Sequence, residues 1–369
     1  MAGIYVHVPF CKQKCTYCDF VSFPNREGEI EPYFTDLCHE IVFRAPEGKG
    51  MEFDTVYFGG GTPSFVPAVF VTAALTLVKR YYRVKENAEI TIEMNPGTVT
   101  AEKLAAYKRA GFNRFSVGFQ TADDRELARL NRIHTKADFI AATELLAGEN
   151  FSADVMIGLH DQKKEDVIES LRVALNHGAS HISMYALTPE DGTPVYTDYL
   201  NGELPCADEV RALYDAGVSY LESRGFHRYE VSNFALPGWE SRHNLNYWRR
   251  GEYLGFGIAA HSFLRNRRYS NTENPAEYRL ALKNERLPVV FSEELTKEEA
   301  EEELLMLAFR LKEGLDLATY KAATGKDFLT AYAEKLKRYA GCLEISETRV
   351  SVKDEYLYVQ DEIVSGLLA

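Results

Sequence analysis

Six short apolar runs, each followed by a stretch with helical periodicity, recur through the first half of this chain. They occupy residues 4–8, 55–58, 89–93, 114–117, 151–157 and 181–187. Their β-branched and aromatic residues favour strands. Between them lie stretches such as 100–110, where Thr100 can cap the start of a helix and Gly111 can end it. Strands that alternate with helices are typically parallel. We therefore predict an α/β fold, with a partial (β/α)6 barrel favoured over a doubly wound sheet.

The ends of these runs carry motifs that would meet at one edge of such a barrel. In parallel barrels the chemistry lies on the loops that follow the strands. Three cysteines follow the first run and a Gly-Gly-Gly-Thr-Pro segment at 59–63 follows the second. Glu93 ends the third run and Gln120 follows the fourth. Asp154 and Tyr185, in the last two runs, can point the same way. The shared edge predicts one functional site.

After residue 187 the alternation fades, and the C-terminal part has another character. The expected elements are helices at 207–224, 295–310 and 327–339 and a hairpin at 349–359. Helices followed by a hairpin favour a smaller, helical, winged-helix-like domain. We therefore predict two domains, residues 1–270 and residues 285–369.

Composition and charge narrow the classes of partner. The 42 Lys and Arg against 55 Asp and Glu give a formal charge of −13, which is unfavourable for binding a polyanion. Nucleic acid is therefore not expected as a partner. No run is long enough to span a membrane, and the chain opens directly into a strand pattern without an export signal. We expect a cytoplasmic protein.

Cys11, Cys15 and Cys18 place three soft ligands on one short loop. Such a set suits an iron–sulfur cluster or zinc. A structural zinc site usually has a second Cys or His pair, for which Cys38-His39 is only a loose candidate. Three thiolates leave one iron of a four-iron cluster open to a ligand from outside the protein.

With Tyr17 directly before the third cysteine, this loop resembles the C-x3-C-x2-C motif of the radical S-adenosylmethionine (SAM) superfamily. Further blocks, spread over most of the chain, resemble its coproporphyrinogen oxidase-like branch. They are Tyr5-Val-His-Val-Pro-Phe-Cys11, Gly-Gly-Gly-Thr-Pro, Glu93-Met-Asn-Pro-Gly, Ser116-Val-Gly-Phe-Gln120 and Arg129-Leu-Asn-Arg132-Ile-His134-Thr. The resemblance implies a radical SAM partial barrel that holds a [4Fe-4S] cluster on the three cysteines and binds SAM.

The glycine segment has an ordinary interpretation and a functional one. Triple glycines often form tight turns, because glycine permits positive φ and close backbone approach. No Gly-Lys-Ser/Thr follows, so it is not a P-loop. The resemblance implies that Gly60, Gly61 and Thr62 bind the methionyl amino group of SAM. Tyr5 is either core packing or a contact beside the cofactors.

Four further residues are implied in SAM binding. The resemblance places Glu93 against the methionyl moiety, Gln120 and Asp154 against the ribose hydroxyls, and Arg132 against the carboxylate. A lone charge in an apolar barrel is costly unless it is paired, and a guanidinium suits a carboxylate. The alternative is an internal ion pair between an acidic residue and the arginine.

Two features separate this chain from the oxidase of the same branch. The oxidase pattern is C-x3-C-x2-C-x-C, preceded by a long N-terminal extension. In this chain Phe20 stands in place of the fourth cysteine, and the first strand begins close to Met1. The segment His243-Asn-Leu-Asn-Tyr-Trp248 resembles the HNxxYW motif of the heme chaperones. The resemblance implies a protein that binds heme and transfers it to acceptors. A chaperone need not catalyse, and no catalytic residue is assigned.

An enzymatic alternative stays open. A radical SAM enzyme acting on a porphyrin would be a coproporphyrinogen III dehydrogenase or a heme-opening methyltransferase. Phe20 disfavours the first, and no motif discriminates the second.

His243 is the candidate heme ligand, with Tyr247 and Trp248 available to cover the porphyrin. A histidine among aromatic residues is also commonly a hydrogen-bonded structural residue. His261 and His227 are reserve candidates. The implied partners are heme and heme-accepting proteins, with membrane-bound respiratory enzymes among the candidate acceptors, so that a peripheral position at the membrane and a homodimer are compatible with this function.

One segment departs from the family pattern. Gly158-Leu-His160-Asp161-Gln162 stands where the family more commonly has a Gly-Leu-Pro-Gly-Gln-like turn. The shape of this loop is therefore not predicted.

Overall fold

The computed structural model describes residues 1–369, and its largest element is a 12-stranded sheet. Six parallel strands follow one another across its centre in chain order. They are β1 (Ala2–Val8), β4 (Phe53–Gly60), β5 (Val84–Met94), β6 (Arg114–Gln120), β7 (Phe151–Ile157) and β8 (His181–Ala186). Among them, β1 and β7 are buried at every position but one, as expected for parallel strands covered on both faces. The predicted partial barrel is confirmed.

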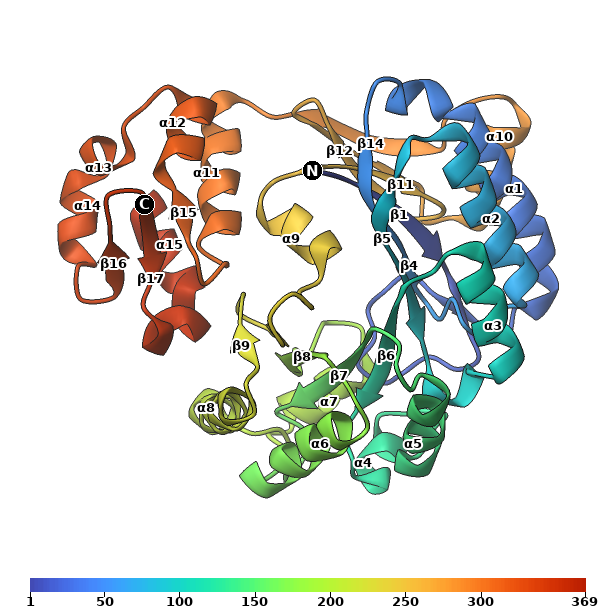
Figure 1. The fold of residues 1–369 in the computed structure, drawn as a ribbon, viewed down its shortest axis with the longest axis horizontal. Helices are drawn as coiled ribbons and strands as arrows, with labels where there is room; N and C mark the ends of the chain where they lie inside the picture. Colours follow the sequence, from blue (N-terminus) through green and yellow to red (C-terminus); the bar gives the residue numbers. More distant parts are fainter.

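Helices cover the outer face of this sheet, as Figure 1 shows. They are α1 (Ile30–Phe43), α2 (Ala68–Tyr81), α3 (Ala101–Ala110), α4 (Asp124–Arg129), α5 (Lys136–Leu145) and α6 (Lys164–Asn176). Thr100 caps α3 by accepting the N–H of Lys103, and Gly111 ends it in a left-handed conformation with φ 104°, as predicted. Apolar side chains of strands and helices join in one core.

The sheet continues beyond the six strands on both sides. The further elements are β2 (Phe10–Cys11), β3 (Phe23–Pro24), α7 (Pro194–Leu200), α8 (Ala207–Ser223), β9 (His227–Arg228), β10 (Asn233–Ala235), α9 (Arg242–Trp248), β11 (Glu252–Phe256), β12 (His261–Leu264), β13 (Arg267–Asn271), α10 (Pro275–Lys283) and β14 (Val289–Glu294). Strand β11 runs parallel beside β1, and β12 to β14 follow as an antiparallel extension. Helix α9 lies inside the curve of the sheet and packs against β1 and β4 (Figure 1).

A second core forms the C-terminal part, shown in orange and red in Figure 1. Its elements are α11 (Lys297–Ala308), β15 (Leu315–Asp316), α12 (Leu317–Thr324), α13 (Phe328–Ala331), α14 (Ala333–Arg338), β16 (Leu343–Ile345), β17 (Arg349–Val352) and α15 (Gln360–Leu368). Three strands form a small sheet in the order β15-β17-β16, beside the helices. Because β14 is paired with β13, the large sheet extends to Glu294 before this part begins.

Two details of the C-terminal part differ from the expectation. The helix expected at 327–339 is divided into α13 and α14 at Tyr332, whose backbone leaves the helical region while its ring stacks on Phe328 at a centroid distance of 4.7 Å. The hairpin expected at 349–359 is formed by β16 and β17, one strand earlier. Residues 354–359 form a 3-10 helix whose buried side chain is Leu357. No helix of the chain has the length and apolarity needed to cross a bilayer.

Candidate functional site

The three cysteines lie on the loop after β1, at the end of the strand where the barrel chemistry was expected. Cys11 ends the short strand β2 and is buried, whereas Cys15 and Cys18 are half-buried. The N–H of Cys18 donates to the carbonyl of Cys15 at 3.3 Å, which closes the turn between them. Burial raises the pKa of the Cys11 and Cys18 thiols. All three thiols face one cavity.

The cysteine loop is anchored between two helices of the barrel. The N–H of Thr16 donates to the carbonyl of Leu130, directly after α4, at 3.1 Å. The carbonyl of Thr16 accepts the N–H of Val195, in the first turn of α7, also at 3.1 Å. The position of the thiols therefore depends on how α4 and α7 are held.

A cavity of about 160 Å³ lies between the cysteine loop and the strand ends. It brings together, with one exception, the residues that the resemblance assigned to SAM. They are Gly60, Gly61, Thr62, Glu93, Gln120, Arg132 and Asp154. The exception is Tyr5, which lines a neighbouring cavity, where its hydroxyl lies 3.0 Å from Nδ1 of His7.

The glycine segment forms a tight turn and a cavity wall at once. Gly60 has φ +109°, and a β-carbon there would collide with the ring of His7. A β-carbon on Gly61 would lie 2.8 Å from the carbonyl oxygen of Phe10. Only glycine permits this approach of the backbone to the cysteine loop. The turn and the binding role are therefore compatible with each other.

Glu93 and Asp154 are half-buried carboxylates without a cation partner. Glu93 accepts the hydroxyl of Tyr57 at 2.8 Å and the N–H of Gly60 at 3.1 Å. Burial raises the pKa of Glu93 to about 7 against the hydrogen bond from Tyr57, and the charge of Asp154 adds to the rise. Burial likewise raises the pKa of Asp154 to about 6. Raised pKa values of this kind are typical of functional sites.

Arg132 is half-buried at the cavity wall and forms no ion pair with a carboxylate. Its Nη2 donates to the carbonyl of Gly118 at 2.7 Å, and its Nη1 lies 3.5 Å from both the Cys15 thiol and the Tyr17 hydroxyl. Its Nε has no partner. The internal acid–arginine pair considered as the alternative is thus not formed by Arg132. Since an unpaired buried charge is costly, these groups point to a charged ligand.

Gln120 is held at the opposite wall of the cavity. Its backbone adopts the left-handed region with φ 72°, which is uncommon for a residue with a side chain. Its Oε1 accepts the hydroxyl of Tyr185 at 2.8 Å. The strained turn aims an amide into the cavity, where it can bind hydroxyl groups.

The residues present fit the two cofactors implied by the resemblance. Three thiols on one loop are the usual protein ligands of an open [4Fe-4S] cluster. A guanidinium with an unpartnered Nε and two unpaired carboxylates suit a ligand that carries both a carboxylate and an amino group, as SAM does. Cys11, Cys15 and Cys18 would hold the cluster, and the cavity beside them would hold SAM.

His243, on α9, is buried and bonded at both ring nitrogens. Nδ1 lies 2.7 Å from Oγ1 of Thr55, and Nε2 lies 2.8 Å from the hydroxyl of Tyr247. The ring also stacks on Tyr57 with centroids 5.0 Å apart. Burial lowers the pKa of His243 to about 3. An iron-ligand role would require one of these hydrogen bonds to break.

A larger cavity of about 580 Å³ lies between the cysteine loop, α9, the β11–β13 extension and α11. Its apolar lining is mainly aromatic, and includes Phe20, Tyr247, Trp248, Tyr253 and Phe263. Phe20 and Trp248 also line a third cavity of about 570 Å³ inside the barrel. The large cavity is therefore adjacent to both the cysteine loop and the barrel interior.

The histidines near this cavity differ in how their rings are engaged. His261, an exposed residue, lines it and makes no hydrogen bond through its ring, and partial desolvation lowers its pKa. His7 also lines it, but its Nδ1 meets Tyr5 and its Nε2 lies 2.8 Å from the carbonyl of Val21. His227 pairs with Glu240 at 2.7 Å outside the cavity.

Several lining residues were not found from the sequence. Tyr57, whose hydroxyl donates to Glu93, lies within strand β4 and is not part of any recognisable sequence motif. Glu303 and Leu307 come from α11 of the C-terminal part, and nothing local in their sequence relates them to β1. The aromatic composition of residues 228–263 was the available signal for this region.

Comparisons with known proteins agree with this geometry. Residues 5–174 match the radical SAM superfamily, and residues 295–356 match the HemN C-terminal domain. The heme chaperone HemW of Bacillus subtilis is 30% identical over 100% of this chain and 99% of its own length. The heme chaperone HemW of Escherichia coli is 37% identical over 70% of this chain and 69% of its own length.

A solved structure shows the same fold over almost the whole chain. The coproporphyrinogen III oxidase HemN of Escherichia coli, described as a radical SAM enzyme, superposes with a TM-score of 0.87. The match covers 99% of this chain and 89% of that one at 19% identity. The second core and the barrel therefore occur together in another protein.

Proposed function

Because this chain belongs to the HemW family of radical SAM proteins, we propose that it binds heme and transfers it to acceptor proteins. The observation that carries this proposal is the cavity of about 580 Å³ beside the cysteine loop. Its wall contains Tyr247 and Trp248, the last two residues of the HNxxYW segment. Its volume is in the range of small-molecule and cofactor sites.

The lining of this cavity suits a porphyrin. Tyr253 and Phe263 add to the aromatic surface that would cover the ring faces. Arg250 and Arg268, which share the carboxylate of Glu303, supply guanidinium groups of the kind that bind carboxylates such as the heme propionates. Apolar walls and basic groups are thus placed together at one site.

We place the iron ligand at His261 rather than at His243. A neutral imidazole nitrogen free of hydrogen bonds can coordinate iron, and the ring of His261, which lines the cavity, meets this condition. His243 instead holds the hydroxyl of Tyr247 at the cavity wall through its Nε2. In this assignment the motif histidine positions the wall and does not touch the iron.

The cluster and SAM sites belong to the same proposal. Cys11, Cys15 and Cys18 would hold a [4Fe-4S] cluster, and SAM would bind beside Glu93 and Arg132. The cytoplasm is the proposed location, because its reducing conditions keep such thiols available. We propose heme-accepting proteins as partners, with membrane-bound respiratory enzymes among them, reached by a peripheral homodimer.

A second candidate function is supported by one observation. The barrel cavity of about 570 Å³ shares Glu93, Asp154 and Tyr185 with the proposed SAM site. A porphyrin substrate bound there would lie next to SAM, as a radical SAM enzyme requires. When bound and reduced, the cluster would supply the electron that cleaves SAM in such an enzyme. Phe20, in place of a fourth cysteine, disfavours the coproporphyrinogen III dehydrogenase reaction.

The test is an anaerobic heme titration of the cluster-loaded protein, followed by the Soret band and by transfer to an apo-acceptor. We expect saturable binding and transfer, with a shifted Soret band in His261→Ala and an unchanged one in the control His227→Ala. Incubation with SAM, a reductant and coproporphyrinogen tests the alternative. Protoporphyrinogen formed in that incubation, or absence of heme binding with the cluster intact, would contradict the chaperone function.

A further inference from the structure

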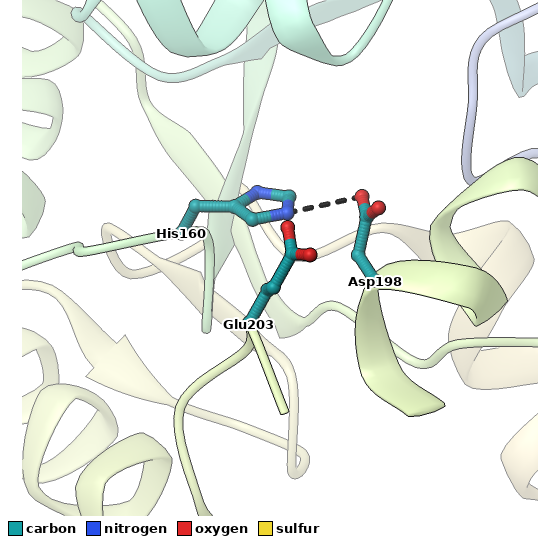
Figure 2. Close-up of side chains that lie close together, drawn as sticks. All are labelled: His160, Asp198 and Glu203. Carbon is teal, nitrogen blue, oxygen red and sulfur yellow. Dashed lines mark hydrogen bonds and ion pairs between the residues drawn. The ribbon is translucent and has the colours of Figure 1, made fainter. Parts of the chain in front are cut away.

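His160 lies within a group of three carboxylates that no step of the proposed function uses. His160 belongs to the loop after β7 that departs from the family pattern. Asp198 comes from α7 and Glu203 from the turn that follows it. Figure 2 shows the His160 ring with both carboxylates directed at its Nε2 edge. Glu126, on α4, approaches the ring from the other nitrogen.

Three possible metal-ligand atoms lie close together in this group. Nε2 of His160 lies 3.0 Å from Oδ2 of Asp198, and one oxygen of Glu203 lies within 4.8 Å of both. The His160 side chain is only 5% exposed, so its position is set by the protein and not by solvent. Two carboxylates converging on one imidazole nitrogen give a nitrogen and two oxygen donors to a single point.

The other face of the imidazole adds an independent observation. Nδ1 of His160 and Oε2 of Glu126 are 3.6 Å apart, within ion-pair distance but too far for a hydrogen bond, and both are buried atoms without a hydrogen-bond partner. A histidine that binds a metal usually donates its other N–H to a carboxylate, which fixes the ring and raises its basicity. Glu126 stands where such a carboxylate is required, and Arg129 holds it at 3.0 Å.

We propose that His160, Asp198 and Glu203 bind a divalent metal ion of the zinc type, with Glu126 as the outer carboxylate. One imidazole and two carboxylates are donors that zinc accepts, with a water in the remaining position. This set contains no thiolate and lies outside the cysteine cavity. The ion is therefore a second metal, separate from the cluster.

The location gives this metal a role in holding the cysteine loop. Helix α4, which carries Glu126, leads directly to Leu130, and α7, which carries Asp198, begins beside Val195. These two residues are the backbone anchors of Thr16. An ion joining His160 to α7, with α4 behind it, would keep both anchors in place and slow the loss of the cluster.

The experiment is equilibrium dialysis of the full-length, cluster-loaded protein against Zn²⁺ without oxygen, with zinc and iron measured on the same sample. The wild type should bind about one zinc per chain while its iron is retained. His160→Gln and Glu203→Gln should abolish this binding, and Glu126→Gln should weaken it by about 10- to 100-fold. His39→Gln, at an exposed position on α1, is the matched control and should bind as the wild type does.

Circular dichroism checks that the variants are folded, and a thermal unfolding measurement provides a second readout of zinc binding. Zinc should raise the thermal midpoint of the wild type and of His39→Gln but not that of Glu203→Gln, whose exposed position makes it the mildest ligand change. Absence of zinc binding in the wild type would show a hydrogen-bonded His–carboxylate network only. Equal binding in His160→Gln would place the ion elsewhere. Either result overturns the proposal, and neither depends on heme.

Discussion

The guanidinium carbon of Arg310 lies 4.4 Å from the ring centroid of Trp248. Arg310 follows α11 of the C-terminal part, and Trp248 ends the helix α9 inside the barrel. Nε of the same arginine donates to Oε2 of Glu230, a fully buried carboxylate, at 3.1 Å. Arg310 therefore joins the second core to the wall of the proposed heme cavity, beside the pairs that Glu303 forms with Arg250 and Arg268.

Removing the Arg310 side chain should lower both the stability of the protein and its affinity for heme. Arg310→Ala deletes a cation–π contact and leaves the buried carboxylate of Glu230 without its cation, a change that we expect to cost about 3 kcal/mol in the free energy of unfolding. Heme affinity should fall with it, because Trp248 loses its support. Urea unfolding and a heme titration measure the two effects. Arg349→Ala removes only exposed pairs and should cost less than about 1 kcal/mol. Equal stability of the two variants would contradict this role.

The guanidinium of Arg132, which lines the cavity beside the cysteines, should decide SAM affinity. Arg132→Lys keeps the positive charge but removes the planar fork that binds a carboxylate with two parallel hydrogen bonds. We expect SAM binding to weaken at least about tenfold, while the iron content stays that of the wild type, since Arg132 supplies no cluster ligand. Equilibrium dialysis with labelled SAM measures this. Arg125→Lys, at a fully exposed position, is the control. A SAM affinity unchanged in Arg132→Lys would place the carboxylate elsewhere.

SAM affinity should also depend on pH through Glu93. With a pKa of about 7, the free carboxyl is neutral below that pH, whereas an amino group donating hydrogen bonds prefers the ionised form. Affinity should therefore fall as the pH decreases below about 7, by at most about tenfold per pH unit. In Glu93→Gln the binding is weaker and this contribution to the slope is absent. Dissociation constants measured between about pH 6 and about pH 8 test it. Parallel slopes in both proteins would exclude Glu93 as the titrating group.

A fully buried network joins α1 to the β11–β13 extension, which lines the proposed heme cavity. Glu40 accepts from Arg44 at 2.8 Å, from Tyr278 at 2.6 Å and from the amide of Asn271 at 2.7 Å. Glu40→Gln keeps the shape but removes the charge that balances Arg44, so we expect a loss of about 3 kcal/mol in the free energy of unfolding. Chemical denaturation measures it. Glu31→Gln, exposed on the same helix, should change the value by less than about 0.5 kcal/mol. A similar effect of both substitutions would show that the network contributes no special stability.

The strands, their functional ends and the ends of a helix could be predicted from the sequence, because each depends on a local pattern of residues. Strands β5 and β6, which carry Glu93 and Gln120 at or next to their last residue, come from short apolar runs, and in a parallel sheet their ends lie at one edge. The cavity that unites them with the cysteines follows from this rule alone. Thr100 and Gly111 bound their helix through side-chain and backbone chemistry that is readable in the sequence.

The features that were missed depend on contacts between distant segments. The break at Tyr332 accompanies a contact with a distant helix, because its hydroxyl donates to Glu301 of α11. The hairpin also differs from the expectation because of packing in the second core. Residues 354–359 form a 3-10 helix that buries Leu357 there, so they do not form the second strand of the hairpin. The engagement of both His243 nitrogens requires Thr55, almost two hundred residues earlier. No local pattern contains this information.

The same histidine should make the barrel sensitive to acid. The pKa of His243 is lowered by burial to about 3 in the folded protein, against about 6.5 when it is exposed in the unfolded chain. Between these values the unfolded chain binds the additional proton, so stability that is complete above about pH 6.5 is lost as the pH falls toward about 3. One such group contributes a slope of at most about 1.4 kcal/mol per pH unit.

His243→Asn removes this titration and isolates its effect. The variant should be less stable than the wild type at neutral pH, because contacts of the ring with Thr55 and Tyr247 are lost, but its stability should fall less steeply between about pH 6 and about pH 5. The 2 tryptophans, Trp239 and Trp248, both lie in the barrel part, so urea unfolding followed by their fluorescence measures this part of the molecule. His39→Asn, exposed on α1, should keep the wild-type slope. Equal slopes in wild type and His243→Asn would show that this imidazole is already protonated when folded, against the burial that surrounds it.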